Sequence, residues 1–147
     1  MTVARNILAF LLGLVVGSGV NMSLLMIGHR VIRVPAGVDT STMEGLASSM
    51  HLFGPEQFLF PFLAHALGTL AGALLGYVIA GSRRRWLAYA VGTAFLFGGI
   101  ANVIMLPAPA WFNAVDLLLA YVPMAWLACV LGSRLVKDDA TDRQITA

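Results

Sequence analysis

The sequence predicts an all-α fold, an integral membrane protein built as a left-handed, antiparallel four-helix bundle with a short amphipathic helix in its first outer loop. Composition is the first observation. Of the 147 residues, 59% are apolar and 11% are charged, with a mean hydropathy of +0.86. In an average soluble domain about 25% of the residues are charged. The second observation is a set of four apolar runs. Each reaches the length of about 20 residues that a helix needs to cross a bilayer.

The apolar runs cover residues 7–27, 58–81, 86–106 and 112–133. Asp116 is the only formally charged residue inside them. A soluble bundle of such helices would have no amphipathic helix to cover its apolar faces, so we assign each run as a membrane span. Residues 1–135 then form one transmembrane domain, with an outer loop at residues 28–57. Residues 136–147 form a short polar cytoplasmic tail, a frayed end with no fold of its own.

Basic residues predict the orientation of the chain. If the spans alternate, one side receives Arg5, Arg83, Arg84, Arg85, Arg134, Lys137 and Arg143. The other side receives Arg30 and Arg33. The positive-inside rule then places both termini in the cytoplasm. The net charge of +2 has the same explanation, so the predicted partner is the lipid bilayer and not a nucleic acid.

The long outer loop carries a helix signal of its own. Ser41 and Glu44 have the spacing of a capping box, with Ser41 as the N-cap. Apolar residues then recur at helical spacing as far as Phe53. This pattern predicts an amphipathic helix over residues 42–53 that lies on the outer surface. Two interpretations are open, because the helix either closes the loop at the interface or forms a lid over an opening between the spans.

Small residues repeat along the second span at every fourth position. They are Ala64, Gly68, Gly72, Gly76 and Ala80. Such ridges allow the backbones of two helices to approach closely in a membrane. The pattern does not distinguish packing inside one chain from packing between chains. A homodimer through Gly68, Gly72 and Gly76 is therefore a possible partner arrangement.

Polar residues from all the spans lie at a similar depth. At a rise of about 1.5 Å per residue, Asn21, His65, Asn102 and Asp116 lie roughly 6–11 Å below the outer surface of the apolar slab. Thr69 lies one turn below His65, and Tyr121 lies below Asp116. We take these six residues as a candidate ligand-binding site for an unknown small solute or ion. A contact between His65 and Asp116 would satisfy both groups.

Each of these residues also has a structural explanation. Asn21 and Asn102 can form hydrogen bonds between helices, each worth about 1 kcal/mol. His65 can be a packing histidine. Asp116 is harder to explain in this way, because a carboxylate within a span costs several kcal/mol unless it is paired or neutral. Pro123 is expected to kink the fourth span, because it lacks the amide hydrogen of a helix interior.

Motifs for catalysis and for cofactor binding are missing from the sequence. It contains no HExxH, no GxSxG and no phosphate-binding loop. The single cysteine, Cys129, excludes an internal disulfide and a cysteine metal cluster. We therefore predict no catalytic residue, no metal site and no cofactor.

Two stretches resemble a set of small, uncharacterised bacterial four-span inner-membrane proteins. They are PFLAHALGTLAGA at residues 61–73, and LPAPAWF at residues 106–112 with its continuation to Asp116 and to AYVPM at residues 120–124. The resemblance extends from the first span through the fourth. It implies a multi-pass protein of the bacterial inner membrane. It implies no reaction, substrate or cofactor, so no functional residue is carried over.

Three functions are compatible with these features. The first is a small-solute or ion carrier or channel, with a polar site in the outer half of the bundle. The alternative is a structural or accessory subunit that packs through its glycine ridges. The third is a membrane-embedded, lipid-modifying enzyme with His65 and Asp116 as acid and base, for which no nucleophile motif is present.

Overall fold

The computed structural model describes the backbone of residues 2–145 and the side chains of residues 2–136. All regular elements in this part of the chain are helical. The α-helices are α1 (Thr2–Val31), α2 (Met43–Ser49), α3 (Leu59–Ile79), α4 (Arg84–Met105), α5 (Ala110–Leu119) and α6 (Val122–Ile145). Two short 3-10 helices, η1 (Met50–Leu52) and η2 (Pro55–Phe58), lie between α2 and α3.

Four helical segments are long and apolar enough to cross a membrane. They are Thr2–Val31, Pro55–Ile79, Arg84–Met105 and Ala110–Val136. The predicted spans are therefore found, and the chain has the helices of a multi-pass membrane protein. The observed first helix is longer than the predicted span, because the helix begins before the apolar run and continues past it.

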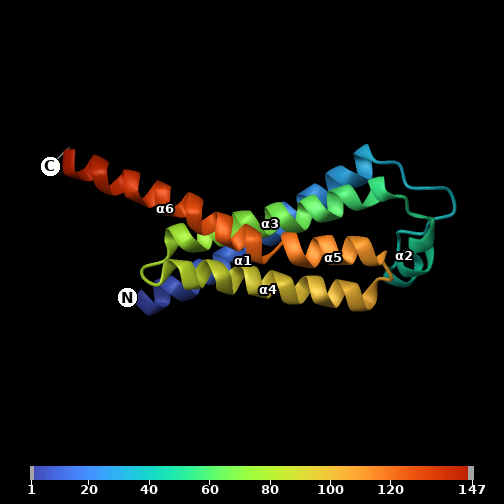
Figure 1. Ribbon diagram of the computed structural model, residues 1–147, viewed down its shortest axis with the longest axis horizontal. Coiled ribbons are helices and arrows are strands. Elements are labelled where there is room, and N and C mark those ends of the chain that lie inside the picture. The colour runs from blue at the N-terminus through green and yellow to red at the C-terminus, as the bar shows by residue number, and fades with distance from the viewer. Residues whose placement is uncertain (1, 146–147) are drawn as a thin grey trace.

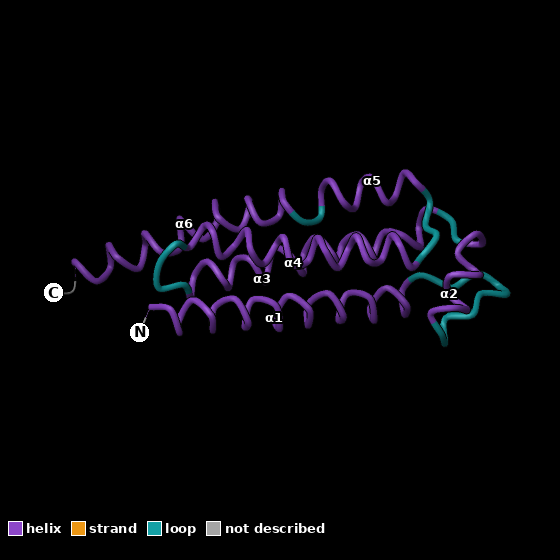
Figure 2. Tube along the Cα trace, turned by 90° about the horizontal axis from the view of Figure 1, so that it is seen from below, coloured by secondary structure: helices purple, strands orange, loops and turns teal. Residues whose placement is uncertain are grey.

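The long helices lie side by side along one axis of an elongated molecule (Figures 1 and 2). The start of α1 and the end of α6 lie at one end, called here the terminal end (Figure 1). Helix α2 and its connecting loops lie at the opposite end, called the α2 end (Figure 1). Gly13 of α1 faces Gly72 of α3, and Gly17 faces Gly68. Helices α1 and α3 are therefore antiparallel to each other.

The small residues of α3 form the tightest helix contact in the molecule. A Cβ atom on Gly72 would lie 2.5 Å from the Gly13 carbonyl oxygen, and one on Gly68 would lie 2.8 Å from the Gly17 carbonyl oxygen. The expected close packing is thus confirmed, within one chain. Because α1 covers this ridge, a homodimer through the same glycines would require α1 to leave it.

The start of α1 also holds the short connection between α3 and α4. The Asn6 side-chain oxygen accepts hydrogen bonds from the backbone N–H groups of Gly81, at 3.0 Å, and Ser82, at 3.3 Å. Arg5 Nε donates to the Ile79 carbonyl oxygen at 2.6 Å. These bonds satisfy backbone groups that the ends of α3 and α4 leave without helical partners. The terminal end is therefore tied together by polar side chains of α1.

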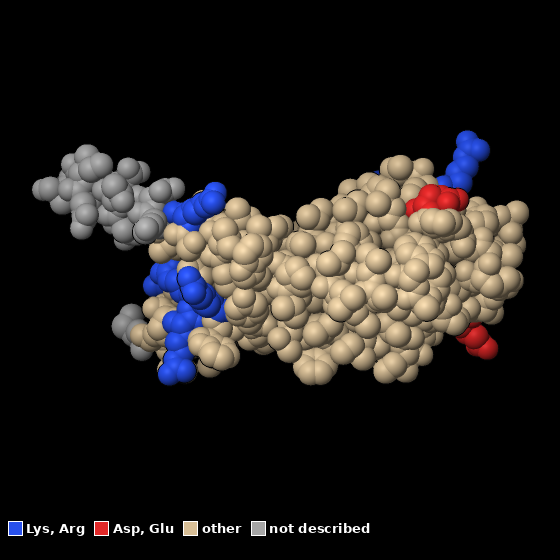
Figure 3. Space-filling model, in the orientation of Figure 1, with Lys and Arg blue, Asp and Glu red and all other residues tan. Residues whose placement is uncertain are grey.

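Charged residues gather at the two ends of the molecule. Figure 3 shows most of the visible Lys and Arg side chains at the terminal end, Asp and Glu side chains together with some Lys or Arg near the α2 end, and, on this face, an uncharged surface between them. The arginines of the helix ends at the terminal end are Arg5, Arg83, Arg84, Arg85 and Arg134. The surface between the ends has the apolar character of a membrane-spanning belt.

The fourth span is broken rather than continuous. Helix α5 ends at Leu119 and α6 begins at Val122, where the sequence predicted one run with a kink. Pro123 has no N–H for the Leu119 carbonyl oxygen, and its ring excludes that carbonyl from a regular helix. Beyond the span, α6 continues to Ile145. The helix thus extends into the predicted polar tail, and residues 146–147 lie outside the described residues.

The amphipathic helix begins one residue later than the capping box predicted. Thr42, not Ser41, is the N-cap, and its hydroxyl accepts a 2.9 Å hydrogen bond from the Gly45 N–H. Ser41 instead donates its N–H and its hydroxyl to Asp39 Oδ1, at 2.8 and 2.6 Å. Both hydrogen bonds hold the pKa of Asp39 below its ordinary value, and the bond from the Ser41 hydroxyl has the larger effect. The α-helix ends at Ser49, and η1 completes most of the predicted range.

Candidate functional site

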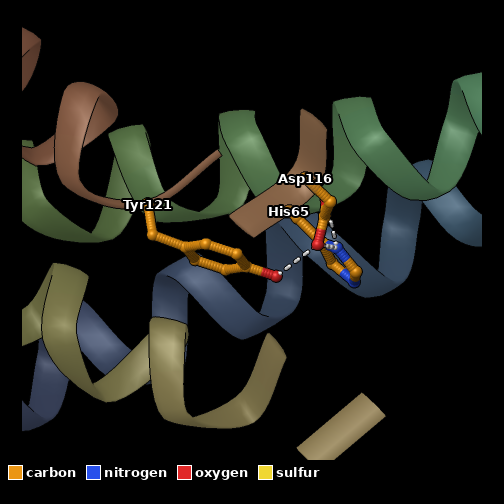
Figure 4. A network of polar contacts seen from close by, with 3 residues as sticks. All are labelled: His65, Asp116 and Tyr121. Atoms are coloured by element: carbon orange, nitrogen blue, oxygen red, sulfur yellow. Dashed lines mark hydrogen bonds and ion pairs between the residues drawn. The ribbon is translucent and has the colours of Figure 1, made fainter. Parts of the chain in front are cut away.

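A buried hydrogen-bond network joins α3 to the break in the fourth span (Figure 4). His65 Nδ1 lies 2.9 Å from Asp116 Oδ1 and 3.0 Å from Asp116 Oδ2. The Tyr121 hydroxyl donates a 2.9 Å hydrogen bond to Asp116 Oδ2. Asp116 is 3% exposed and Tyr121 is 1% exposed. A buried carboxylate is costly without such partners, so the network explains how this part of the bundle accommodates Asp116.

The break in the fourth span makes this network possible. Asp116 and Tyr121 are five residues apart, which on a continuous helix would place them about 140° apart around the axis. Because α5 ends before Tyr121, the tyrosine side chain can return toward Asp116 (Figure 4). Pro123 is therefore the sequence feature that determines the position of Tyr121.

A cavity of about 320 Å³ lies beside the network, at the α2 end of the bundle. Its size is within the range of small-molecule sites, which is about 300–1,000 Å³. Helices α1, α3, α4 and α5 all contribute to its walls. Most of the lining is apolar. The polar lining side chains are His29, Gln57, His65, Asn102, Asn113 and Asp116.

Residues of α2 and the 3-10 helices cover the cavity at the α2 end. Met43 and Leu46 of α2, together with Met50 of η1, are lining residues. Phe58 is 4% exposed and packs against Phe112, with ring centroids 4.7 Å apart. The amphipathic helix therefore has the position of a lid over the opening between the long helices, which is the second of the two interpretations given above.

Helices α1 and α4 each supply an exposed polar side chain to the cavity lining. His29 of α1 and Asn102 of α4 both line the cavity and are exposed. These two helices diverge toward the α2 end (Figure 1).

The structure brings together only part of the predicted site. His65, Asn102 and Asp116 line the cavity, and Tyr121 reaches it through Asp116. Asn21 is not a lining residue: its Cβ lies 3.0 Å from the position that a Cβ on Gly68 would take. Thr69 is fully buried outside the cavity lining. The Asn21 side-chain oxygen and the Thr69 hydroxyl have no hydrogen-bond partner among the described residues.

Three polar lining residues were absent from the prediction. His29 and Gln57 lie in what the sequence suggested to be the outer loop, and α1 and η2 bring them to the cavity. Asn113 lies three residues before Asp116, and residues at this spacing share a helix face. That spacing was a usable signal for Asn113. No comparable signal existed for Gln57, because its position depends on the path of the loop.

Metal binding has no support from the arrangement of ligands. The described residues contain no group of three or more His, Cys, Asp or Glu side chains that could hold a metal ion. The polar groups are therefore considered as hydrogen-bonding partners of an organic ligand.

Comparisons with known proteins assign no family to the chain. No protein-family model matches it, and neither the curated proteins nor the solved structures give a significant match. The resemblance to small bacterial inner-membrane proteins stays a prediction. The function therefore has to be argued from the site itself.

Proposed function

We propose that this protein is a carrier for a small, largely apolar solute in the bacterial inner membrane. In this proposal four antiparallel spans cross the bilayer, and both termini lie in the cytoplasm. The cavity then opens in the outer half of the bundle, with His65 and Asp116 at its floor and α2 as its lid. The observation that carries the proposal is a cavity of ligand size at the α2 end of the bundle, lined by apolar residues and a few polar side chains.

Packing below the cavity favours a carrier over a channel. The terminal half of the bundle contains a core cluster that includes Tyr77, Val91, Ala125 and Cys129, each no more than 7% exposed. Close glycine contacts between α1 and α3 lie at the same level. Since a channel needs a continuous path, this closed half corresponds to an outward-facing state of a carrier, with α2 over the cavity, in which access alternates around a fixed site.

Charge supports the proposed orientation. The terminal end carries Arg83, Arg84 and Arg85 in one short connection. The loops at the α2 end carry Arg30 and Arg33 together with Asp39, Glu44 and Glu56. Basic residues in short loops favour the cytoplasmic side, so the α2 end is assigned to the outside.

The single cysteine provides a direct test of alternating access. Cys129 is 7% exposed in the closed half of the bundle. We expect a small, membrane-impermeant methanethiosulfonate to modify it from the cytoplasmic side in inside-out vesicles, because a carrier must open this half during its cycle. The same reagent should leave Cys129 unmodified in right-side-out vesicles. Mass spectrometry of the intact protein measures the modification.

The Cys129→Ala variant is the matched control, because it removes the only thiol. Complete protection of Cys129 from both sides, under conditions in which the protein is folded, would contradict the carrier. A static bundle would then be indicated, and an accessory subunit would become the better assignment.

A further inference from the structure

We propose that the cavity binds a compact, largely apolar molecule that carries a hydrogen-bond donor, such as a hydroxyl or N–H group, and no negative charge. This inference rests on the proposed function and names the class of solute. Hydrogen bonds within the protein leave some atoms of the polar lining residues available to a ligand. The chemistry of these atoms determines the class of solute.

His65 offers an acceptor to the cavity. Its Nδ1 atom lies within hydrogen-bond distance of both Asp116 oxygens, and a carboxylate in this position accepts the Nδ1 hydrogen. In the uncharged form of the imidazole, the lone pair is then on Nε2. Figure 4 shows the second ring nitrogen of His65 pointing away from Asp116. A ligand that reaches His65 therefore meets an acceptor, which requires a donor on the ligand.

Two amide side chains of the cavity also leave their oxygens as acceptors. Asn113 Nδ2 donates to the Ala108 carbonyl oxygen at 3.2 Å, and Gln57 Nε2 donates to the Arg33 carbonyl oxygen at 3.3 Å. Because a carbonyl oxygen can only accept, these contacts determine which amide atom is nitrogen. The side-chain oxygens remain as acceptors. Gln57 Oε1 is buried and has no partner among the described residues.

Charge and shape restrict the ligand further. Asp116 is the only Asp, Glu, Lys or Arg among the described lining residues, so an anionic ligand would meet a carboxylate and no lysine or arginine. Phe53, Phe58 and Phe112 supply aromatic surface at the covered end of the cavity. Asn102 offers both a donor and an acceptor, so it favours neither a ligand with a donor nor a ligand with an acceptor. An apolar ring with one donor therefore matches both parts of the lining.

Three probes of nearly equal shape separate these properties. 4-Propylphenol carries a donor, 4-propylanisole has the donor replaced by a methyl ether, and 4-propylbenzoate carries a negative charge. Saturable binding to the full chain in lipid nanodiscs is measured by ligand-observed NMR. We expect the phenol to bind at least about tenfold more tightly than the anisole, since the anisole leaves acceptors unpaired. The benzoate should bind most weakly.

Variants identify the acceptors responsible. The double variant His65→Phe, Asp116→Leu removes the pair without leaving a buried carboxylate, and it should bring phenol and anisole to similar affinities. Asn113→Leu removes a second acceptor, should reduce the preference in part, and remains informative if the double variant fails to fold. Thr69→Val is the matched control, because Thr69 is buried outside the cavity lining, and it should keep the full preference.

The outcomes separate this inference from the proposed function. Saturable and equal binding of phenol and anisole would overturn the inference and leave a cavity that binds apolar solutes. Tightest binding of the benzoate would overturn it as well, as would an unchanged preference in both acceptor variants. An absence of saturable binding for phenol and anisole alike would overturn the inference together with the proposed binding cavity.

Discussion

At the scale of single residues, Asp116 organises the polar part of the site. Its two oxygens accept from His65 of α3 and from Tyr121, which lies at the break between α5 and α6. The carboxylate holds the imidazole in one tautomer, as second-shell carboxylates do in many protein sites. The hydrogen bond from Tyr121 satisfies the other side of the same group.

The Tyr121→Phe variant tests this role. Removing the hydroxyl should lower the free energy of unfolding by about 1–3 kcal/mol, because a buried carboxylate loses one of its two donors. Reversible unfolding in mixed detergent micelles measures the change. Tyr77→Phe is the matched control: Tyr77 is 7% exposed and makes no hydrogen bond to another described side chain, so its loss should stay within about 0.5 kcal/mol. Equal effects of the two substitutions would argue against the network.

At the scale of elements, the contact between α1 and α3 determines how closely the bundle packs. Gly68 and Gly72 bring the two backbones together where any side chain would meet a carbonyl oxygen. Without a hydrophobic drive between helices in lipid, such close van der Waals contact is a main source of association. Gly98 of α4 lacks this function, because a Cβ atom there would meet nothing within 4 Å.

Alanine substitutions at these glycines should therefore have opposite signs. Gly72→Ala should destabilise the protein by about 1–3 kcal/mol, because the added methyl group forces two backbones apart. Gly98→Ala should stabilise it by about 0.5–1 kcal/mol, the usual gain from replacing a helical glycine. Unfolding in mixed micelles again measures both. A destabilising effect at Gly98 as large as that at Gly72 would show that α4 has an interface which the single chain does not contain.

Much of the element order could be predicted from the sequence, and the exceptions have local physical causes. Hydropathy identified the four long helices, because span length depends on a run of residues and not on tertiary contacts. The N-cap of α2 was misplaced because Asp39 engages Ser41 and leaves Thr42 to cap the helix. Pro123 was recognised as a disruption, but whether a proline kinks or breaks a helix depends on its neighbours.

The candidate site could be predicted only in part, because depth in a span does not determine rotation about the helix axis. Asn21 and His65 have similar depths, yet Asn21 lies against Gly68 while His65 lines the cavity. Thr69 shares a helix with His65 but is buried outside the cavity lining. The contribution of Gln57 required the path of the outer loop, for which no sequence rule exists.

At the scale of the whole molecule, the bundle has a packed half and a hollow half. Small residues and the core around Val91 fill the terminal half. The cavity lies in the α2 half, where residues of α2 and its neighbouring 3-10 helices cover it. This asymmetry is what a carrier with one closed and one open side requires, and it concentrates function in the half with the less complete packing.

The central claim is that the hollow half is a binding cavity, and filling it is the most direct test. Val103 lines the cavity, while its neighbour Ile104 is 80% exposed on the outside of α4. We would measure saturable binding of 4-propylphenol to the wild-type chain, Val103→Trp and Ile104→Trp in nanodiscs. We expect Val103→Trp to abolish binding and Ile104→Trp to retain wild-type affinity. Equal binding by the two variants would contradict the central claim.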